Sequence, residues 1–230
     1  MSEIVFKSHA PGFWPNDTPD QWNNHIWQLK NRITSLSALE QHVELCEEER
    51  AGVLLSGNKL AMAITPHFFN LIDKNDPDCP IRRQVIPRIE ETLTDPAEMS
   101  DPCGEDSHMP VPGLVHRYPD RVLFLVTDRC AAYCRYCTRS RVVSGVSEQK
   151  LETQWEAAFD YLEKTPSVRD VLISGGDALL FSDARLDRLL SRLHAIPHIQ
   201  FVRIGSRIPI FLPQRITPEL CAILKKYHPL

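Results

Sequence analysis

The sequence predicts an α/β fold, in which a helical region over residues 1–115 precedes part of a parallel (β/α) barrel over residues 116–230. The second region alternates three short apolar runs, each suited to a strand buried on both faces, with three helical patterns. In chain order these segments are 122–126, 150–164, 170–173, 182–195, 201–204 and 218–227. Such alternation favours parallel strands joined by right-handed crossovers. A closed eight-stranded barrel takes about 250 residues. Only about 110 residues follow Asp120, so we expect three strand–helix units here.

The first region carries helical and irregular patterns. Residues 21–33 space four apolar side chains by four, three and four positions, which predicts one helix with a core-facing stripe: Trp22, Ile26, Leu29 and Ile33. We expect Asp17 or Thr18 to cap its start, and Thr65 followed by Pro66 to begin another helix.

The helical patterns of the second region have a defined buried face and a defined start. Residues 182–195 place four leucines on one face of a helix: Leu186, Leu189, Leu190 and Leu193. Thr217 is a suitable N-cap for a last helix that begins at Pro218.

Charge and hydropathy exclude some classes of protein. A net charge of −4 and a pI near 6.1 argue against a protein built to grip nucleic acid. No apolar stretch approaches the roughly 20 residues that span a bilayer, and the N-terminus lacks the basic and apolar segments of a signal peptide. We therefore expect a cytoplasmic protein that binds neither nucleic acid nor a membrane.

Three of the seven cysteines lie close together after the first predicted strand, as C-x-x-x-C-x-x-C: Cys130, Cys134 and Cys137. In a reducing compartment such a group binds metal more often than it forms disulfides. Thiolates hold iron–sulfur clusters, and three of them leave one iron of a [4Fe–4S] cube open to a further ligand. The spacing therefore predicts such a cluster, against the alternatives of a zinc site or a chance grouping. The other cysteines are expected to be unpaired thiols: Cys46, Cys79, Cys103 and Cys221.

Arginines surround the three cysteines in the sequence: Arg129, Arg135, Arg139 and Arg141. They could be solvated surface charge, or a basic collar that offsets cluster charge and attracts a carboxylate or phosphate.

Ser174, Gly175, Gly176 and Asp177 (the SGGD loop) follow the second predicted strand. Two glycines allow the backbone to approach a ligand closely, and the aspartate offers a carboxylate to an ammonium group. A tight turn before a helix cap explains the pattern equally well. Because parallel strands end at one edge of a sheet, we expect this loop to lie beside the cysteines.

Arg117, Tyr118 and Arg121 precede the first predicted strand. They could bind an anion, since guanidinium groups pair with phosphate. From the residues alone, a structural turn with solvated arginines is the favoured interpretation.

The chain resembles the lysine 2,3-aminomutase family of radical S-adenosylmethionine enzymes over nearly its whole length. Six segments carry the resemblance: WNNHIWQLKNRI, MAITPHFFNLIDKNDPDCPIRRQ, PVPGLVHRYPDRVLFLVTDRC, TPSVRDVLISGGDALLFSD, IPHIQFVRIGSRIPIFLPQRITPEL and LKKYHP. The resemblance implies an isomerase, an intramolecular aminotransferase. It also implies that residues 116–230 are the first part of a barrel of radical S-adenosylmethionine type.

The resemblance also assigns roles to residues. The three cysteines would bind the [4Fe–4S] cluster, and Arg139 would pair with the carboxylate of the amino-acid substrate. S-adenosylmethionine would lie against the SGGD loop, Arg207 and Tyr136, which can pack beside an adenine. Pyridoxal phosphate would be bound by three residues: Arg117, Tyr118 and Arg121.

The implied reaction begins when the reduced cluster splits S-adenosylmethionine into methionine and a 5′-deoxyadenosyl radical. The radical removes a β-hydrogen from an amino acid bound to pyridoxal phosphate, and the nitrogen moves from Cα to Cβ. L-lysine, giving β-lysine, is the default substrate; glutamate, arginine or a lysine on a protein are alternatives. An electron donor such as flavodoxin or ferredoxin and a homo-oligomeric state are also expected.

Two departures from the family pattern stand out. Relatives often have histidine before the third cysteine and three arginines after it, where this chain has Tyr136 and the interrupted Arg139-Ser140-Arg141. The aldimine-forming lysine of the family would fall beyond residue 230, and neither Lys225 nor Lys226 matches it. We therefore expect a fragment with no catalytic lysine, inactive alone as a mutase. A non-catalytic iron–sulfur or partner-completed subunit and a zinc-binding module are the alternatives.

Overall fold

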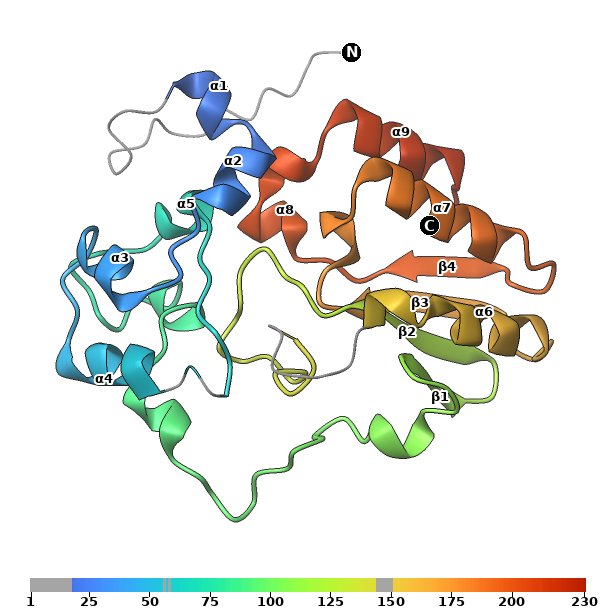
Figure 1. The fold of residues 1–230 in the computed structure, drawn as a ribbon, viewed down its shortest axis with the longest axis horizontal. Helices are drawn as coiled ribbons and strands as arrows, with labels where there is room; N and C mark the ends of the chain where they lie inside the picture. Colours follow the sequence, from blue (N-terminus) through green and yellow to red (C-terminus); the bar gives the residue numbers. More distant parts are fainter. Residues whose placement is uncertain (1–17, 56, 58, 144–150) are drawn as a thin grey trace.

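The computed structural model describes residues 18–230, except residues 56, 58 and 144–150. Its described part is an α/β fold around a four-stranded mixed sheet with the order β1-β2-β3-β4 (Figure 1). The strands are β1 (Leu114–Tyr118), β2 (Arg121–Thr127), β3 (Asp170–Gly175) and β4 (Phe201–Ile204). β2, β3 and β4 run parallel, which confirms the three predicted strands and their direction.

β1 corrects the sequence-based expectation. The segment before β2 is a strand that pairs antiparallel with it, with Leu114 opposite Phe124 and Tyr118 opposite Arg121. Only Pro119 and Asp120 separate the two strands, the shortest common hairpin connection. The turn expected around this segment is therefore confined to two residues, and the sheet is mixed rather than wholly parallel.

Helices from the second half cover the sheet. On α6 (Trp155–Glu163), Trp155 and Phe159 meet Phe124 of β2 edge-on, with ring centroids 6.4 and 5.7 Å from its own. α7 (Asp183–His194) starts at the cap Ser182 and buries its four predicted leucines. α9 (Pro218–Lys226) starts at Thr217, as predicted, and lies against α7 (Figure 1).

The N-terminal helix predicted over residues 21–33 is wrong. The chain forms two short helices because the Asn24 side chain accepts hydrogen bonds from the N–H groups of Ile26 and Trp27 and so caps a new helix. Ile26, expected in the core, is 46% exposed as a result. The predicted caps at Thr18 and Thr65 are confirmed; Asp17 lies outside the described residues.

The remaining elements are short. The α-helices are α1 (Pro19–Trp22), α2 (His25–Lys30), α3 (Leu36–Glu40), α4 (Glu47–Leu55), α5 (Pro66–Phe69) and α8 (Ile208–Phe211). The 3-10 helices are η2 (Arg82–Gln84), η3 (Ile89–Thr92), η4 (Asp106–His108), η5 (Leu151–Thr153), η6 (Ala178–Leu180) and η7 (Pro213–Arg215). None of the helices in the described ranges is long and apolar enough to cross a membrane.

One hydrophobic core runs from the N-terminal helices into the sheet. It includes Ile64 and Phe69 as well as Val126 and Ala131, all buried. The loop after β2 that carries the three cysteines (the cysteine loop, residues 128–141) therefore lies between the N-terminal helices and the sheet (Figure 1).

Candidate functional site

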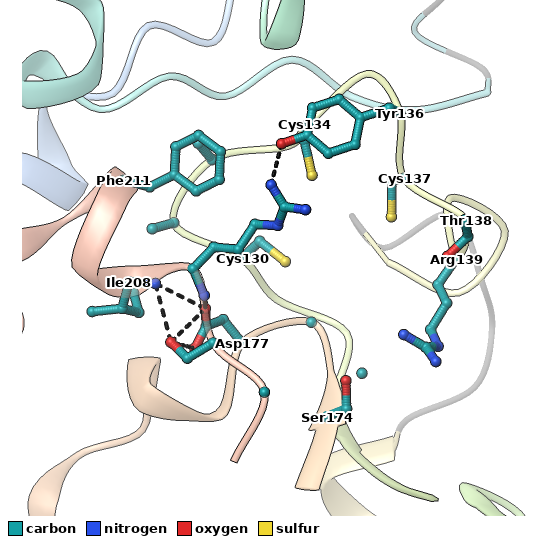
Figure 2. A pocket seen from close by; sticks show the side chains of 17 residues that line it. Cys130, Cys134, Tyr136, Cys137, Thr138, Arg139, Ser174, Asp177, Ile208 and Phe211 are labelled. Atoms are coloured by element: carbon teal, nitrogen blue, oxygen red, sulfur yellow. Dashed lines mark hydrogen bonds between the residues drawn. The ribbon is translucent and has the colours of Figure 1, made fainter. Parts of the chain in front are cut away.

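A cavity of about 430 Å³ lies at the carboxyl ends of the parallel strands. Its walls come from the cysteine loop after β2, the SGGD loop at the end of β3 and the loop after β4, Gly205-Ser206-Arg207 (the GSR loop). All three cysteines of the motif line it, and Figure 2 shows their sulfur atoms facing the same space. Predicted residues from three parts of the chain thus meet in one pocket.

The three thiols differ in their surroundings. Burial raises the pKa of Cys130 to about 12. The Cys137 thiol is hydrogen-bonded to Cys134, which lowers the pKa of Cys134 and raises that of Cys137. Within the described residues, no three His, Cys, Asp or Glu side chains converge as a single metal ion requires. Cysteine sulfurs of one short loop that face one cavity are donors that an iron–sulfur cluster or a zinc ion could take.

The N-terminal region holds the cysteine loop by its backbone. The amide of Tyr133 donates to the carbonyl of Ala63 at 3.1 Å, and the amide of Arg135 donates to that of Gln84 at 2.8 Å. The Arg32 guanidinium donates to the carbonyl of Cys130 at 3.1 Å. These contacts fix the path of the loop between the cysteines.

The four nearby arginines do not form one collar around the pocket; Arg139 alone among them lines it. Arg135 points away, into an ion pair with Glu91 at 2.6 Å and hydrogen bonds to the carbonyls of Leu60 and Ala61. Arg141 pairs with Asp101 at 3.0 Å. Arg135 therefore links the cysteine loop to the N-terminal region and does not contribute positive charge to the lining of the pocket.

The two glycines of the SGGD loop are required because the end of β2 and the start of the cysteine loop pass close to them. Gly175 has a φ of +108°, and a Cβ at Gly176 would lie 2.2 Å from the carbonyl oxygen of Arg129. Across this contact the amide of Gly176 donates to the main-chain carbonyl of Thr127 at 2.6 Å, and the amide of Asp177 donates to that of Arg129 at 2.8 Å. The glycines thus let two pocket walls meet backbone to backbone.

Asp177 joins the SGGD loop to the GSR loop. Its buried carboxylate accepts hydrogen bonds from the Ser206 hydroxyl at 2.8 and 2.9 Å, from the amide of Arg207 at 2.7 Å and from that of Ile208 at 3.2 Å. The amide of Leu179 completes the set at 3.1 Å. Burial raises the pKa of Asp177, against the effect of these donors. The carboxylate therefore binds protein donors here, where the sequence suggested an ammonium group.

Asp177→Asn should lower the free energy of unfolding by about 1–3 kcal/mol. Each carboxylate oxygen of Asp177 accepts hydrogen bonds. In either orientation of the asparagine amide, its NH₂ group would therefore face N–H or O–H donors instead of acceptors. Denaturant titration and faster amide hydrogen exchange at Arg207 and Ile208 would measure the loss. Ser206→Ala removes one donor to the Asp177 carboxylate and one of the two acceptors of the Ile208 amide, which keeps Asp177 as the other. It should cost about 1 kcal/mol or less; equal losses in the two variants would contradict this account.

Tyr136 and Arg207 meet over the pocket. The Arg207 guanidinium donates to the Tyr136 hydroxyl and lies 4.8 Å from the centre of its ring (Figure 2). The Tyr136 hydroxyl also donates to the Gln84 side chain at 3.2 Å. Ser174 lines the same pocket from β3. Tyr136, expected beside an adenine, and Arg207, expected to help bind S-adenosylmethionine, thus lie together at one side of the cavity.

A second cavity, of about 230 Å³, contains the predicted anion-binding residues Arg117, Tyr118 and Arg121. Arg203 of β4 adds a further guanidinium, paired with Asp170 at 2.9 Å. Arg139 lines this cavity and the cysteine pocket alike. The two predicted sites therefore share one side chain.

Glu105 is a site residue that the sequence analysis missed. Its buried carboxylate pairs with Arg139 at 2.7 Å, and one of its oxygens has no hydrogen-bond partner in the described structure. It comes from the segment before β1, 34 residues from Arg139 in sequence. No local pattern could have paired the two, because only the fold brings them together.

The site and the fold define an α/β protein with a cysteine-lined pocket at the carboxyl edge of its parallel strands. No family model matches the chain. L-lysine 2,3-aminomutase of Fusobacterium nucleatum is 53% identical over 218 residues, which cover 95% of this chain and 51% of that protein. The enzyme of the same name from Clostridium subterminale is 51% identical over 208 residues, covering 90% of the chain and 50% of the relative. Glutamate 2,3-aminomutase of Clostridioides difficile is 41% identical over 214 residues, covering 93% and 50%.

The chain belongs to the lysine 2,3-aminomutase family, a family of isomerases. It spans about half the length of the curated relatives it matches.

Proposed function

We propose that Cys130, Cys134 and Cys137 hold a [4Fe–4S] cluster and that S-adenosylmethionine binds beside it. The whole protein is then a pyridoxal phosphate-dependent amino-acid 2,3-aminomutase that converts L-lysine to β-lysine, built on a barrel of radical S-adenosylmethionine type. The names of the relatives support the reaction, and lysine is the substrate that most of these names carry. Glutamate is the alternative, from the name of one relative.

One observation carries the proposal: the three thiols share a single cavity with the SGGD and GSR loops. Three thiolates leave one iron of the cube open. Bound there, the cluster supplies the electron that splits S-adenosylmethionine. The chain's own residues shape the space: Ser174 and the glycines form its floor, and Tyr136 with Arg207 form the wall that an adenine would face.

The second cavity suits the phosphate of pyridoxal phosphate. Arg117 and Arg121 offer guanidinium donors, and Tyr118 lies beside them with the Arg121 guanidinium 5.7 Å from its ring centre. Arg139, between the two cavities, is positioned to orient a substrate carboxylate toward both. An electron donor such as flavodoxin or ferredoxin, and assembly as a homo-oligomer, complete the proposal.

Anaerobic reconstitution with iron and sulfide tests the cluster. The wild-type chain should take up iron and sulfide in equal amounts and gain a broad visible absorbance. Cys130→Ala, Cys134→Ala and Cys137→Ala should each lose most of both, because each removes one of three ligands. Cys221→Ala, an exposed thiol outside the cavity, should not. Stoichiometric zinc without iron would contradict the proposal.

Formation of 5′-deoxyadenosine after reduction tests the chemistry. The reconstituted chain should cleave S-adenosylmethionine, and assays with candidate amino acids and added pyridoxal phosphate should reveal any β-amino acid. A chain that holds the cluster but never cleaves S-adenosylmethionine would instead be a non-catalytic iron–sulfur subunit.

A further inference from the structure

The second cavity borders one face of the sheet. Three neighbours in strand register line it: Leu123 of β2, Leu172 of β3 and Arg203 of β4. Phe124, the next residue of β2, points to the other face, where it meets α6, because successive side chains of a strand alternate between faces. Arg203 therefore reaches the cavity from the side of β3 opposite to Arg121, one of the predicted anion-binding residues.

Asp170 fixes the orientation of the Arg203 guanidinium. Asp170 lies on β3 opposite Arg121 of β2, and it shares a face of the sheet with Leu172. Its carboxylate accepts hydrogen bonds from Nε and Nη2 of Arg203, each at 2.9 Å. Arg203 makes no hydrogen bond through Nη1 within the described residues. That end of the guanidinium can therefore bind a ligand while the contact with Asp170 is kept.

The second cavity keeps a positive charge when every ion pair is counted. Four guanidinium groups line it: Arg117, Arg121, Arg139 and Arg203. Three of these have a carboxylate partner, at 3.5, 2.7 and 2.9 Å respectively: Arg121 with Asp120, Arg139 with Glu105 and Arg203 with Asp170. Arg117 donates instead to the main-chain carbonyl of Cys103 at 3.2 Å. Among the described residues its charge is thus not balanced by an ion pair, which favours an anionic ligand here.

We propose that Arg203 is a third guanidinium ligand of a phosphate group bound in the second cavity. The inference rests on the proposed function, which assigns this cavity to the phosphate of pyridoxal phosphate through Arg117 and Arg121. β2 and β4 lie about 10 Å apart across β3, a span that a phosphate between two arginine side chains can bridge. Guanidinium groups bind phosphate oxygens through paired N–H donors. Arg203 thus holds the anion from the side opposite to the β1–β2 hairpin.

Calorimetric titration of the chain with 4′-deoxypyridoxine 5′-phosphate tests the proposal. This probe keeps the ring and the phosphate of pyridoxal phosphate but lacks the aldehyde, so it forms no Schiff base with lysines. Inorganic phosphate is the second probe, and it separates binding of the phosphate group from binding of the ring. Neither probe needs the iron–sulfur cluster, and far-UV circular dichroism before each titration checks that the variants are folded.

Arg203→Gln should raise the Kd of both probes about tenfold. This variant also leaves the Asp170 carboxylate unpaired, and that carboxylate would itself repel an anion. The double variant Arg203→Gln/Asp170→Asn removes both charges of the pair and so separates the two effects. If Arg203 is a phosphate ligand, the double variant should still bind both probes about tenfold more weakly than the wild type. Wild-type affinity in the double variant would show that Arg203 only neutralises Asp170, and would overturn the proposal.

The matched control is a second two-point ion pair, on the helices that cover the other face of the sheet. Arg192 of α7 donates to Glu156 of α6 at 2.5 and 2.8 Å, and neither residue lines the second cavity. Arg192→Gln/Glu156→Gln should bind both probes within about twofold of the wild type.

Arg121→Gln separates failure of this inference from failure of the proposed function. It should weaken the binding of both probes, since Arg121 belongs to the proposed phosphate site. Weaker binding in Arg121→Gln, together with wild-type affinity in Arg203→Gln/Asp170→Asn, refutes the role of Arg203 alone. A wild-type chain that binds neither probe, or that binds both unchanged in Arg121→Gln, refutes the phosphate site of the proposed function as well.

Discussion

Gly176→Ala is expected to lower the free energy of unfolding by about 2–3 kcal/mol and to prevent most cluster uptake. The new Cβ would lie 2.2 Å from the carbonyl oxygen of Arg129 and 2.6 Å from its carbonyl carbon. Both atoms are backbone, so no side chain can rotate away. Relief requires the start of the cysteine loop to move, and Cys130 is the next residue. Denaturant titration and iron analysis after reconstitution measure the two effects.

Gly205→Ala is the matched control on the neighbouring GSR loop. A Cβ there meets its nearest atoms at 3.8 Å, an ordinary van der Waals distance. This variant should unfold within about 1 kcal/mol of the wild type and should keep its iron. If Gly176→Ala behaved like Gly205→Ala, the close approach of the two loops would be refuted.

Arg82→Met is expected to destabilise the chain by about 3–5 kcal/mol. The Arg82 side chain is 0% exposed and that of its partner Glu49 is 1%, and the two are joined at 2.6 and 2.7 Å. The guanidinium also donates to the carbonyls of Lys74 at 2.9 Å and Glu44 at 2.8 Å. The variant would leave a buried carboxylate without its countercharge, together with two carbonyls that lose their donor.

Arg50→Met, on the same helix as Glu49, provides the comparison. Arg50 pairs with Glu40, but the two side chains are 50% and 34% exposed. Exposed pairs contribute about 0–1 kcal/mol, so this variant should unfold almost like the wild type. Chemical denaturation of both proteins gives the difference directly, and losses of similar size would contradict the role assigned to Arg82.

Local chemistry made much of the second half predictable. The leucine stripe of α7 and the Thr217–Pro218 start of α9 are signals within one helix, and the apolar run of β2 is long enough to indicate a buried strand. β1 was missed because its charged residues resemble a turn. Its strand conformation comes from pairing with β2, which no local pattern reveals.

The site divides in the same way. The cysteine spacing is local, so the three thiols could be predicted to lie together. The SGGD loop could be predicted to lie beside them because both loops follow parallel strands of one sheet. The direction of each side chain could not be predicted. Arg135 and Arg139 each lie within two residues of a motif cysteine. Arg135 nevertheless points into the N-terminal region, because it pairs there with Glu91 and donates to two backbone carbonyls.

The ion pair of Glu105 with Arg139 lowers the affinity that Arg139 can offer to another anion between the two cavities. Arg139 is already held by a buried carboxylate at 2.7 Å. A substrate carboxylate that takes the same donors therefore exchanges with Glu105 rather than adding to it. Its affinity is the difference between the two contacts, and the remaining ion pair of Glu105 with Arg141 at 3.7 Å lowers the cost of displacing Glu105. If Arg139 binds a substrate carboxylate as proposed, selectivity at this position is set by competition with Glu105.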